Sequence, residues 1–286
     1  MKATTQPVKW PAEAIWEQIA PMLPHFTVEV LPEIDSTNTE LMRRAKAGQI
    51  EPILLVAEKQ TAGRGRLGRE WHALAERTEA LPALTFSLGL PLSPLNWSGL
   101  SLAVGLSIAT SMHADIGLKW PNDLWLNDRK LAGILIETCA VVNLVENQRY
   151  VVIGVGINIT KPQIAQDMDQ ALPGLQLRRP PAWLQELMPN IDAPEALLRI
   201  APDLVKTLLI FTEQGFAPFQ TRFHQRDVLR DRQINVDDNQ IDVNNKISGI
   251  ALGVNCSGEL EIQTAQGKKT INSSEVSINP FKTLLL

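Results

Sequence analysis

A loop rich in glycine and arginine lies between two apolar runs, and this arrangement limits the folds open to the chain. The loop, called here the glycine-arginine loop, runs from Gln60 to Trp71 and holds three glycines and three arginines. Residues 53–57 before it and 84–90 after it are short apolar runs, which predict β-strands. Gly63-x-Gly65-x-x-Gly68 matches the dinucleotide fingerprint, but that motif needs a helix directly after the turn. A dinucleotide-binding fold is therefore not expected.

The composition of the loop predicts an anion-binding site. Glycines let the backbone approach a ligand, and guanidinium groups match phosphate oxygens in geometry. The whole chain has a formal net charge of −4 at pH 7, so the arginines are a local positive feature and not part of a basic surface. We expect a small ligand such as a nucleotide phosphate or an acyl phosphate. A loop without any ligand stays open as an alternative from this segment alone.

Four further motifs accompany the loop along the chain. They are Asp35-Ser-Thr-Asn38, Lys119-Trp-Pro-Asn-Asp123, Lys130-Leu-Ala-Gly-Ile-Leu-Ile-Glu137 and Gly154-Val-Gly-Ile-Asn158. With the loop, this set resembles the biotin protein ligase family in its short form, from about residue 33 to the C-terminus. The resemblance implies an α+β fold, in which a mixed-sheet catalytic domain of the biotin/lipoate ligase type precedes a small SH3-like β-barrel.

Hydrophobic periodicity predicts the main elements. We expect helices at 12–20, 97–114 and 196–213, and strands at 28–34, 53–57, 84–90, 131–136 and 151–159. Asn127-Asp128 predicts a hairpin turn. Residues 163–194 are rich in proline and polar residues, which predicts an irregular connection with one short helix.

A further helix is expected to begin at Thr37 and to end at Gly48. Thr37 and Glu40 have the spacing of a capping box. Ser36, Thr37 and Asn38 would then lie at a helix N-terminus, where hydroxyl and N–H groups can hold a polar ligand group. Simple helix capping is the alternative.

A change in sequence texture after Phe223 predicts a boundary between a catalytic domain, residues 1–228, and a C-terminal domain, residues 229–286. In the second, Leu260 and Ile262 alternate with polar residues, as in a small β-barrel. A length of 286 residues with 44% hydrophobic content suits one large and one small domain.

Cysteine usage and the apolar segments indicate a cytoplasmic protein. Cys139 and Cys256 lack metal-ligand spacing, which predicts two unpaired thiols in a reducing compartment. The N-terminus has no signal-peptide pattern, and the longest near-apolar stretch, 99–112, is too short to span a bilayer. About 30 residues precede the first expected strand, fewer than a helix-turn-helix domain needs. We therefore expect neither DNA binding nor membrane contact.

The resemblance implies a two-step reaction with ATP and biotin as substrates. Biotin's carboxylate attacks the α-phosphate of ATP, giving biotinyl-5′-AMP and pyrophosphate. A lysine of a biotin carboxyl carrier protein then attacks the activated carbonyl. Joining two anions requires cations. Lys130 is the expected catalytic cation, since the family's matching lysine reaches both the carboxylate and the α-phosphate; from local sequence alone, a solvated lysine is the ordinary alternative.

The resemblance also gives the loop arginines a role. Arg64, Arg66 and Arg69 match the family's phosphate and adenylate clamp, with Arg69 as the expected contact of pyrophosphate. The glycines permit a loop that is mobile when empty and ordered when filled. Such a closed loop would keep water away from the reactive adenylate.

The remaining site residues are those that the resemblance implies, and they suit biotin, which needs apolar walls with a few fixed polar groups. For biotin they are Ser36, Thr37, Asn38, Gln60, Gly63, Arg64, Gly65, Lys130 and Gly133. For the nucleotide they are Arg64, Arg66, Arg69, Trp71, Asn122, Asp123 and Asn158. Asp123 is also the expected magnesium ligand. Trp71 and Trp120 fit a pocket wall, although a core position is the preferred interpretation of both.

One departure and three alternatives qualify this interpretation. Many family members carry Ser-Pro-x-Gly after the tryptophan, whereas this chain has His72-Ala-Leu-Ala-Glu-Arg-Thr-Glu79, so the path from the loop to the next strand is not predicted.

A lipoate or octanoate ligase would share the fold and the adenylation chemistry. A non-catalytic sensor of biotinyl-AMP would need an effector module, and a nucleic-acid-binding protein would need a wider basic surface. Monomer and homodimer both stay open.

Overall fold

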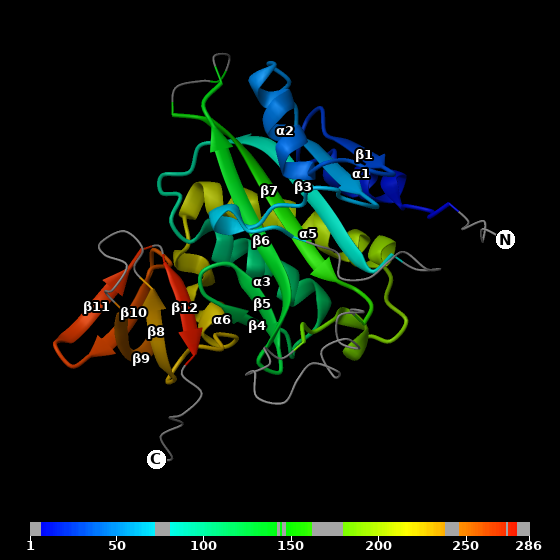
Figure 1. The fold of residues 1–286 in the computed structure, drawn as a ribbon. Helices are drawn as coiled ribbons and strands as arrows, with labels where there is room; N and C mark the ends of the chain where they lie inside the picture. The colour runs from blue at the N-terminus through cyan, green and yellow to red at the C-terminus, as the bar shows by residue number, and fades with distance from the viewer. Residues whose placement is uncertain are drawn as a thin grey trace.

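The computed structural model describes residues 7–71, 81–141, 144, 147–161, 180–237, 246–272 and 274–278. Its main feature is a seven-stranded mixed sheet with the strand order β1-β2-β3-β7-β6-β5-β4 (Figure 1). Its strands are β1 (Thr27–Leu31), β2 (Ile53–Ala57), β3 (Ala83–Leu92), β4 (Gly117–Lys119), β5 (Asp123–Leu126), β6 (Arg129–Cys139) and β7 (Arg149–Asn158). β1 pairs with β2 in parallel and the other pairs are antiparallel, which confirms the expected mixed sheet.

A smaller five-stranded antiparallel sheet follows, in the order β11-β10-β9-β8-β12. Its strands are β8 (Gln233–Asp237), β9 (Lys246–Val254), β10 (Leu260–Thr264), β11 (Gly267–Ile271) and β12 (Glu275–Ile278). Leu260 and Ile262 are buried and Glu261 between them is half-buried, as their alternation predicts. The small all-β unit expected at the C-terminal end is therefore present.

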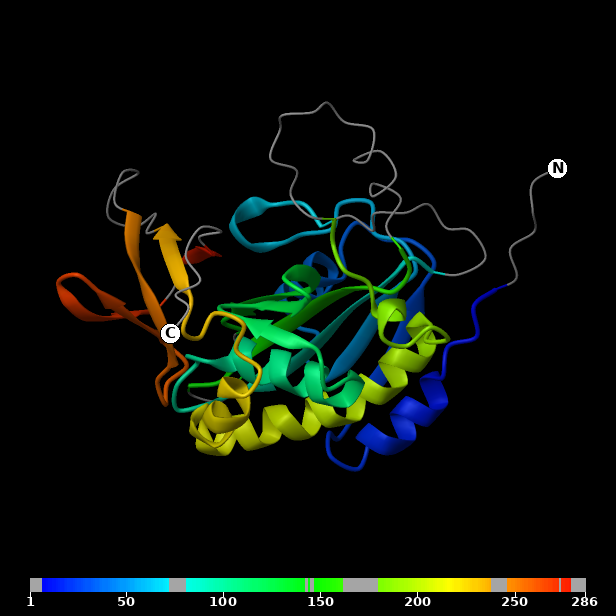
Figure 2. The ribbon, with the colours of Figure 1, turned by 90° about the horizontal axis from the view of Figure 1, so that it is seen from below.

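Helices lie on both faces of the large sheet. α1 (Ala12–Ile19), α3 (Leu100–Met112), α5 (Ala193–Gln214) and α6 (Gln220–His224) form one layer, and α2 (Thr37–Lys46) contacts the other face. Figure 2 shows α3 and α5 beneath the sheet and the glycine-arginine loop above it. Strand alternation produces this division: Leu54 and Val56 face the large helical layer, whereas Leu55 packs with buried residues of α2.

Most expected elements are present, with shifts at their ends. α3 begins at Leu100 and not at residue 97, because Gly99 adopts a left-handed φ of 79° just before it. α5 begins at Ala193, where the Asp192 side chain accepts a hydrogen bond from the backbone of the first turn. The Asn127-Asp128 turn has φ values of 50° and 59°, as a type I′ hairpin turn requires.

The connection before α5 is only partly described. Residues 162–179 lie outside the described residues, as do residues 72–80 after the loop. Between 180 and 192 the chain forms one 3-10 turn, η2 (Leu184–Glu186).

The start of α2 differs from the expected capping box. Ser36 is the N-cap, with an extended φ of −158°, and its hydroxyl accepts a hydrogen bond from Thr39 N at 3.4 Å. Thr37 is already helical, and the Glu40 carboxylate pairs with arginines of the next turn. The predicted Thr37–Glu40 box was wrong by one residue, because the arginines compete for the carboxylate that the box would use. Gly48 follows the end of the helix at φ 88°, as predicted.

The two sheets meet at the Lys119–Asp123 motif. Trp120 is buried, and its indole Nε1 donates to Gly258 O at 3.1 Å, in the turn between β9 and β10. Gly258 lies against Gly99 so closely that a Cβ on it would be 2.6 Å from the Gly99 Cα. The core position preferred for Trp120 is therefore confirmed, and this core spans both sheets.

The segment between α6 and β8 completes the junction. Arg226 donates through Nη1 to the carbonyls of His113, Ala114 and Ile116, just after α3. The residue after it, Asp227, bridges to β4 at Leu118. Both cysteines are unpaired. Among the described helices, none combines the length and apolarity needed to cross a bilayer.

Candidate functional site

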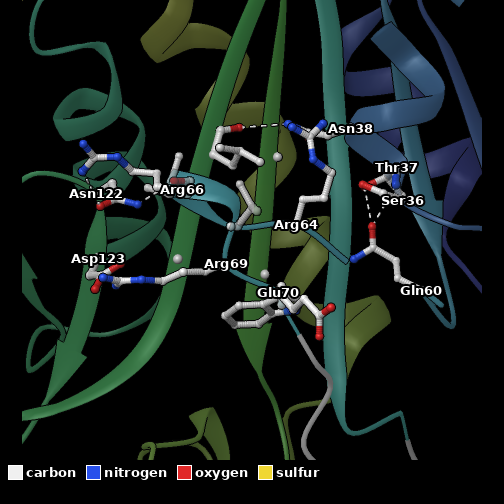
Figure 3. Close-up of a pocket in the computed structure, with 18 of the residues that line it drawn as sticks. Ser36, Thr37, Asn38, Gln60, Arg64, Arg66, Arg69, Glu70, Asn122 and Asp123 are labelled. Carbon is white, nitrogen blue, oxygen red and sulfur yellow. Dashed lines mark hydrogen bonds between the residues drawn. The ribbon is translucent and has the colours of Figure 1, made fainter. Parts of the chain in front are cut away.

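A pocket lies between the large sheet and the glycine-arginine loop (Figure 3). It is lined by Ser36, Thr37, Asn38, Gln60, Arg64, Gly65, Arg66, Arg69, Glu70, Trp71, Phe86, Asn122, Asp123, Lys130, Gly133, Ile134, Leu135, Gly154, Val155 and Gly156. The structure thus brings together nearly all the residues that the sequence motifs predict for one site.

Two predicted residues do not line the pocket. Gly63 is buried within the loop, where its carbonyl accepts a hydrogen bond from Trp71 N at 2.8 Å. Asn158 is buried at the end of β7, and its Nδ2 donates to Ala182 O at 3.0 Å. In the described structure Asn158 therefore fixes the segment that precedes α5 and makes no contact with the pocket.

The floor of the pocket is a bare patch of sheet. Gly133 on β6 pairs with Gly156 on β7, and Gly154 lies two residues before Gly156 on the same face. A Cβ on Gly156 would collide with the Trp71 ring, and one on Gly154 would collide with Asn38. The glycines therefore provide the room in which the side chains of the pocket lie.

Uncharged side chains occupy one end of the pocket, called here the uncharged end. Gln60 Oε1 accepts from the Thr37 backbone N–H at 2.8 Å and from the Thr37 hydroxyl at 3.2 Å. The Ser87 hydroxyl on β3 is hydrogen-bonded to Thr37 Oγ1 at 2.7 Å and to Asn38 Oδ1 at 2.6 Å. Thr37, Asn38 and Ser87 are buried. This end is a fixed network that can receive an uncharged polar group.

Charged side chains occupy the opposite end, called here the charged end. Lys130 Nζ donates to Asp123 Oδ1 at 2.7 Å, and the Lys130 side chain is 44% exposed. Arg66 Nη1 donates to Asn122 Oδ1 at 3.2 Å, while Asn122 Nδ2 donates to Ile134 O at 2.7 Å. Arg69 extends toward Asp123 (Figure 3). A carboxylate or phosphate entering here would meet three cationic side chains from two elements.

Arg64 behaves differently from the other two arginines of the loop. Its guanidinium turns toward Asn38, away from Arg66 and Arg69 (Figure 3). It forms an ion pair with Glu137 on β6, with 3.0 Å between Nη2 and Oε1. Arg64 thus bonds to the sheet beside the uncharged end, whereas its neighbours lie at the charged end.

Trp71 closes the loop against the floor. Its ring lies over Gly156, and its indole Nε1 is buried without a hydrogen-bond partner in the described structure. A core position was the preferred interpretation, but the residue is half-buried and lines the pocket. No group of three or more His, Cys, Asp or Glu side chains suited to a metal occurs in the described part of the chain.

Several residues of the site had no role in the sequence interpretation. They are Glu70, Ser87, Leu135, Glu137, Gly154 and Gly156. A signal existed for some of them: Thr85, Ser87 and Gly89 interrupt an apolar strand at every second position, which marks one polar face. Gly154 and Gly156 have the same spacing in β7.

Family models match both parts of the chain. Residues 30–158 match the Biotin/lipoate A/B protein ligase family, and residues 239–278 match the Biotin protein ligase C terminal domain. Among solved structures, the biotin protein ligase from Aquifex aeolicus in complex with biotin and ATP superposes with a TM-score of 0.65 at 27% identity. That match covers 88% of this chain and 98% of the other.

Characterised relatives give the same result. The bifunctional ligase/repressor BirA of Escherichia coli (strain K12) is 32% identical over 271 residues, covering 92% of this chain and 77% of that protein. The biotin–[acetyl-CoA-carboxylase] ligase of Paracoccus denitrificans is 30% identical over 258 residues, covering 86% of this chain and 98% of that protein. On these matches, together with the site geometry, the chain belongs to the biotin protein ligase family.

Proposed function

We propose that this chain is an ATP-dependent biotin protein ligase. It forms biotinyl-5′-AMP from biotin and ATP and then transfers biotin to a lysine of a biotin carboxyl carrier protein, a carboxylase subunit. One observation carries the proposal above the others: a single pocket joins a buried uncharged hydrogen-bonding end to a cationic end. Biotin has the same two-ended chemistry, with a ureido group at one end and a carboxylate at the other.

The proposed orientation of biotin follows from this match. The ureido group lies at the uncharged end, among Ser36, Thr37 and Gln60, because these groups supply fixed donors and acceptors without a charge. The bicyclic ring lies over the glycine floor, and the carboxylate extends toward Lys130 at the charged end. The reverse orientation would bury a carboxylate among neutral groups, which is costly.

The first step is a displacement at phosphorus. A biotin carboxylate oxygen bonds to the α-phosphorus of ATP, and the bond from that phosphorus to the pyrophosphate oxygen breaks. Lys130 offsets the repulsion between carboxylate and phosphate and the charge that grows on the phosphate oxygens. Asp123 orients the ammonium group through its 2.7 Å hydrogen bond. Arg66 and Arg69 are assigned to the phosphates, and Arg69 to the pyrophosphate.

In the second step the amine of the carrier lysine attacks the carbonyl of biotinyl-5′-AMP, an amide forms, and AMP leaves with the bonding electron pair. The amine must lose a proton, and Asp123, one of the carboxylates that line the pocket, is the proposed acceptor, with water as the alternative. Trp71 and the loop exclude water from the adenylate until the carrier arrives.

A magnesium ion fits the charged end as a partner of the nucleotide. Asp123 and Asn122 carry oxygen atoms there, and a magnesium ion bound chiefly to phosphates and water needs only one or two such ligands from protein. When bound, the ion would neutralise phosphate charge.

The same proposal covers the organisation of the chain. We assign catalysis to residues 1–228 and the small β-barrel to residues 229–286, and we place the protein in the cytoplasm, where ATP and a carboxylase subunit would be available. No role in DNA binding is proposed.

The test is ATP–pyrophosphate exchange with biotin, with lipoate and without an added acid, followed by mass analysis of a carrier domain. We expect exchange that depends on biotin and a carrier mass increased by one biotinyl group. Exchange that is unaffected by biotin, or faster with lipoate, would overturn the assignment.

A further inference from the structure

A closed ring of hydrogen bonds joins both ends of one loop segment to the sheet. Gln60 is bonded to Thr37, Thr37 to Ser87, and Ser87 to Asn38. Asn38 Nδ2 then donates to Glu137 Oε2 at 3.0 Å, and Glu137 accepts from Arg64 at 3.0 Å and 3.3 Å. Because Arg64 belongs to the loop, this contact closes the ring. Residues 60–64 are therefore held at both ends by one network.

Glu137 is the charged member of this ring that does not belong to the loop. Its side chain is 22% exposed and that of Arg64 is 47% exposed, so the pair is only partly in solvent. A charge-assisted pair that also accepts from a buried amide is stronger than an isolated surface pair. If the carboxylate were removed, Asn38 Nδ2 would keep only Leu135 O, at 3.3 Å, and Arg64 would lose its ion pair.

The sheet is shaped to admit this ring. Asn38 points into space that exists only because residue 154 is glycine, since a Cβ there would collide with the amide of Asn38. Gly154 pairs with Ser87 on one side and with Leu135 on the other, so three neighbouring strands meet at the same point. The ring connects α2, β3, β6 and the loop.

We infer that Glu137 is a positioning residue: through Arg64 and Asn38 it seats the glycine-arginine loop over the uncharged end of the pocket, in the absence of any ligand. Arg64 consequently acts as the attachment of the loop, and contact with phosphate belongs to Arg66, Arg69 and Lys130. The consequence for biotin, but not for the loop itself, rests on the proposed function.

Trypsin tests the seating of the loop directly, because cleavage after Arg64 requires this side chain to leave Glu137 and enter the protease. Glu137→Ala should raise the initial rate of cleavage in the ligand-free protein roughly tenfold, and Glu137→Gln roughly threefold. Glu29→Gln is the matched control, since Glu29 also pairs with an arginine, Arg44, outside the pocket. Its cleavage rate should equal that of the wild type. Loop cleavage in Glu137→Ala at the wild-type rate would overturn the inference.

Two further measurements separate positioning from general stability. Gly154→Ala disturbs Asn38 from another strand, so it should raise loop cleavage as well; an unchanged rate would count against the ring. In biotin-dependent exchange, Glu137→Gln should raise the KM for biotin more than it lowers kcat, and equal losses in both would contradict a positioning role. Wild-type protein without biotin-dependent exchange would defeat the proposed function, while the trypsin result would still decide the role of Glu137.

Discussion

The two ends of the pocket are built in opposite ways. At the uncharged end Thr37, Asn38 and Ser87 are buried and satisfy one another's hydrogen bonds. At the charged end the Lys130 side chain is 44% exposed, and its partner Asp123 is 18% exposed. One end is complete before a ligand arrives, whereas the other holds long, partly solvated side chains.

This difference separates recognition from chemistry. A preformed buried network loses little conformational entropy when it binds a matching group, so it favours affinity and selectivity. Water and salt weaken the electrostatic attraction between an exposed cation and an anion. This attraction therefore reaches its full strength only when a ligand and a closed loop exclude solvent. Variants at the two ends should therefore change different kinetic parameters.

The largest effect is expected at the charged end. Lys130→Ala should lower kcat/KM for biotin-dependent ATP–pyrophosphate exchange by roughly 10²–10³-fold, because a cation facing the developing charge is lost. Biotin binding measured by calorimetry should change much less. Lys59→Ala is the matched control, since Lys59 pairs with Glu33 outside the pocket. Near-normal exchange in Lys130→Ala would contradict its role.

A substitution in the glycine floor of the pocket should lower the rate of catalysis by displacing Trp71. In Gly156→Ala the new methyl group collides with the Trp71 ring, so the loop must move outward. A misplacement of about 1 Å can cost up to about 10²-fold in rate, and we expect a loss of roughly tenfold to a hundredfold in exchange. The midpoint of thermal unfolding should fall by only a few degrees. Equal activity of the variant and the wild type would mean that Trp71 does not form part of the working pocket.

At the uncharged end the effect should appear in binding. Thr37→Val removes the hydroxyl that bonds to Gln60 and Ser87, so Gln60 Oε1 keeps only the Thr37 backbone N–H and Ser87 keeps only Asn38. We expect the KM for biotin to rise about tenfold with little change in kcat. Thr61→Val, at an exposed position of the same loop, serves as the control. A fall in kcat alone would break the division between the two ends.

Loss of Arg64 should weaken retention of the intermediate. Arg64→Ala removes the ion pair with Glu137, so the loop should open more often and release about three to five times more free biotinyl-5′-AMP per turnover. Rapid filtration and chromatography would measure the free adenylate. Unchanged retention would contradict a closing role for this part of the loop.

The smallest effect on activity is expected at a residue outside both ends. Burial raises the pKa of Asp227 to about 6, and its Oδ2 is buried without a hydrogen-bond partner in the described structure. The folded protein therefore holds this proton more tightly than the unfolded chain, so this group's contribution is present below about pH 4 and is lost as the pH rises through about 6.

Asp227→Asn should remove that dependence and stabilise the protein at pH 7 by on the order of 1–3 kcal/mol. Urea unfolding at pH 4, 5, 6 and 7 measures it, with the exposed Asp231→Asn as control. A variant that keeps the wild-type slope between pH 4 and 6 would show that another group titrates there.

The sequence predicted the large sheet well because its central strands are rich in apolar residues and are separated by clear turn signals. The 53–57 and 84–90 runs form β2 and β3, and the Asn127-Asp128 turn lies where predicted. Helix α2 begins at Thr37 as expected, but its N-cap is Ser36 and Glu40 pairs with the arginines of the next turn, so the Thr37–Glu40 capping box does not form. Local spacing does not reveal such competition.

The sequence predicted which residues form the site but not which side chains contact one another. The motifs supplied Thr37, Gln60, Lys130 and Asp123, yet no local pattern tells which way a long side chain turns. Arg64 therefore could not be distinguished from its two neighbours in the loop until Glu137, 73 residues later in the chain, was placed beside it. The roles of these residues in binding and catalysis remain predictions.

The indole of Trp120 has a consequence for dissecting the enzyme. Its N–H group donates a hydrogen bond to a carbonyl of the small barrel, and Asn122 and Asp123 follow it closely in the sequence. A truncated protein that stops before β8 would leave this donor unsatisfied in an opened core, immediately beside residues proposed to bind the nucleotide. The small barrel therefore supports the pocket, and we do not expect residues 1–228 to fold correctly without it.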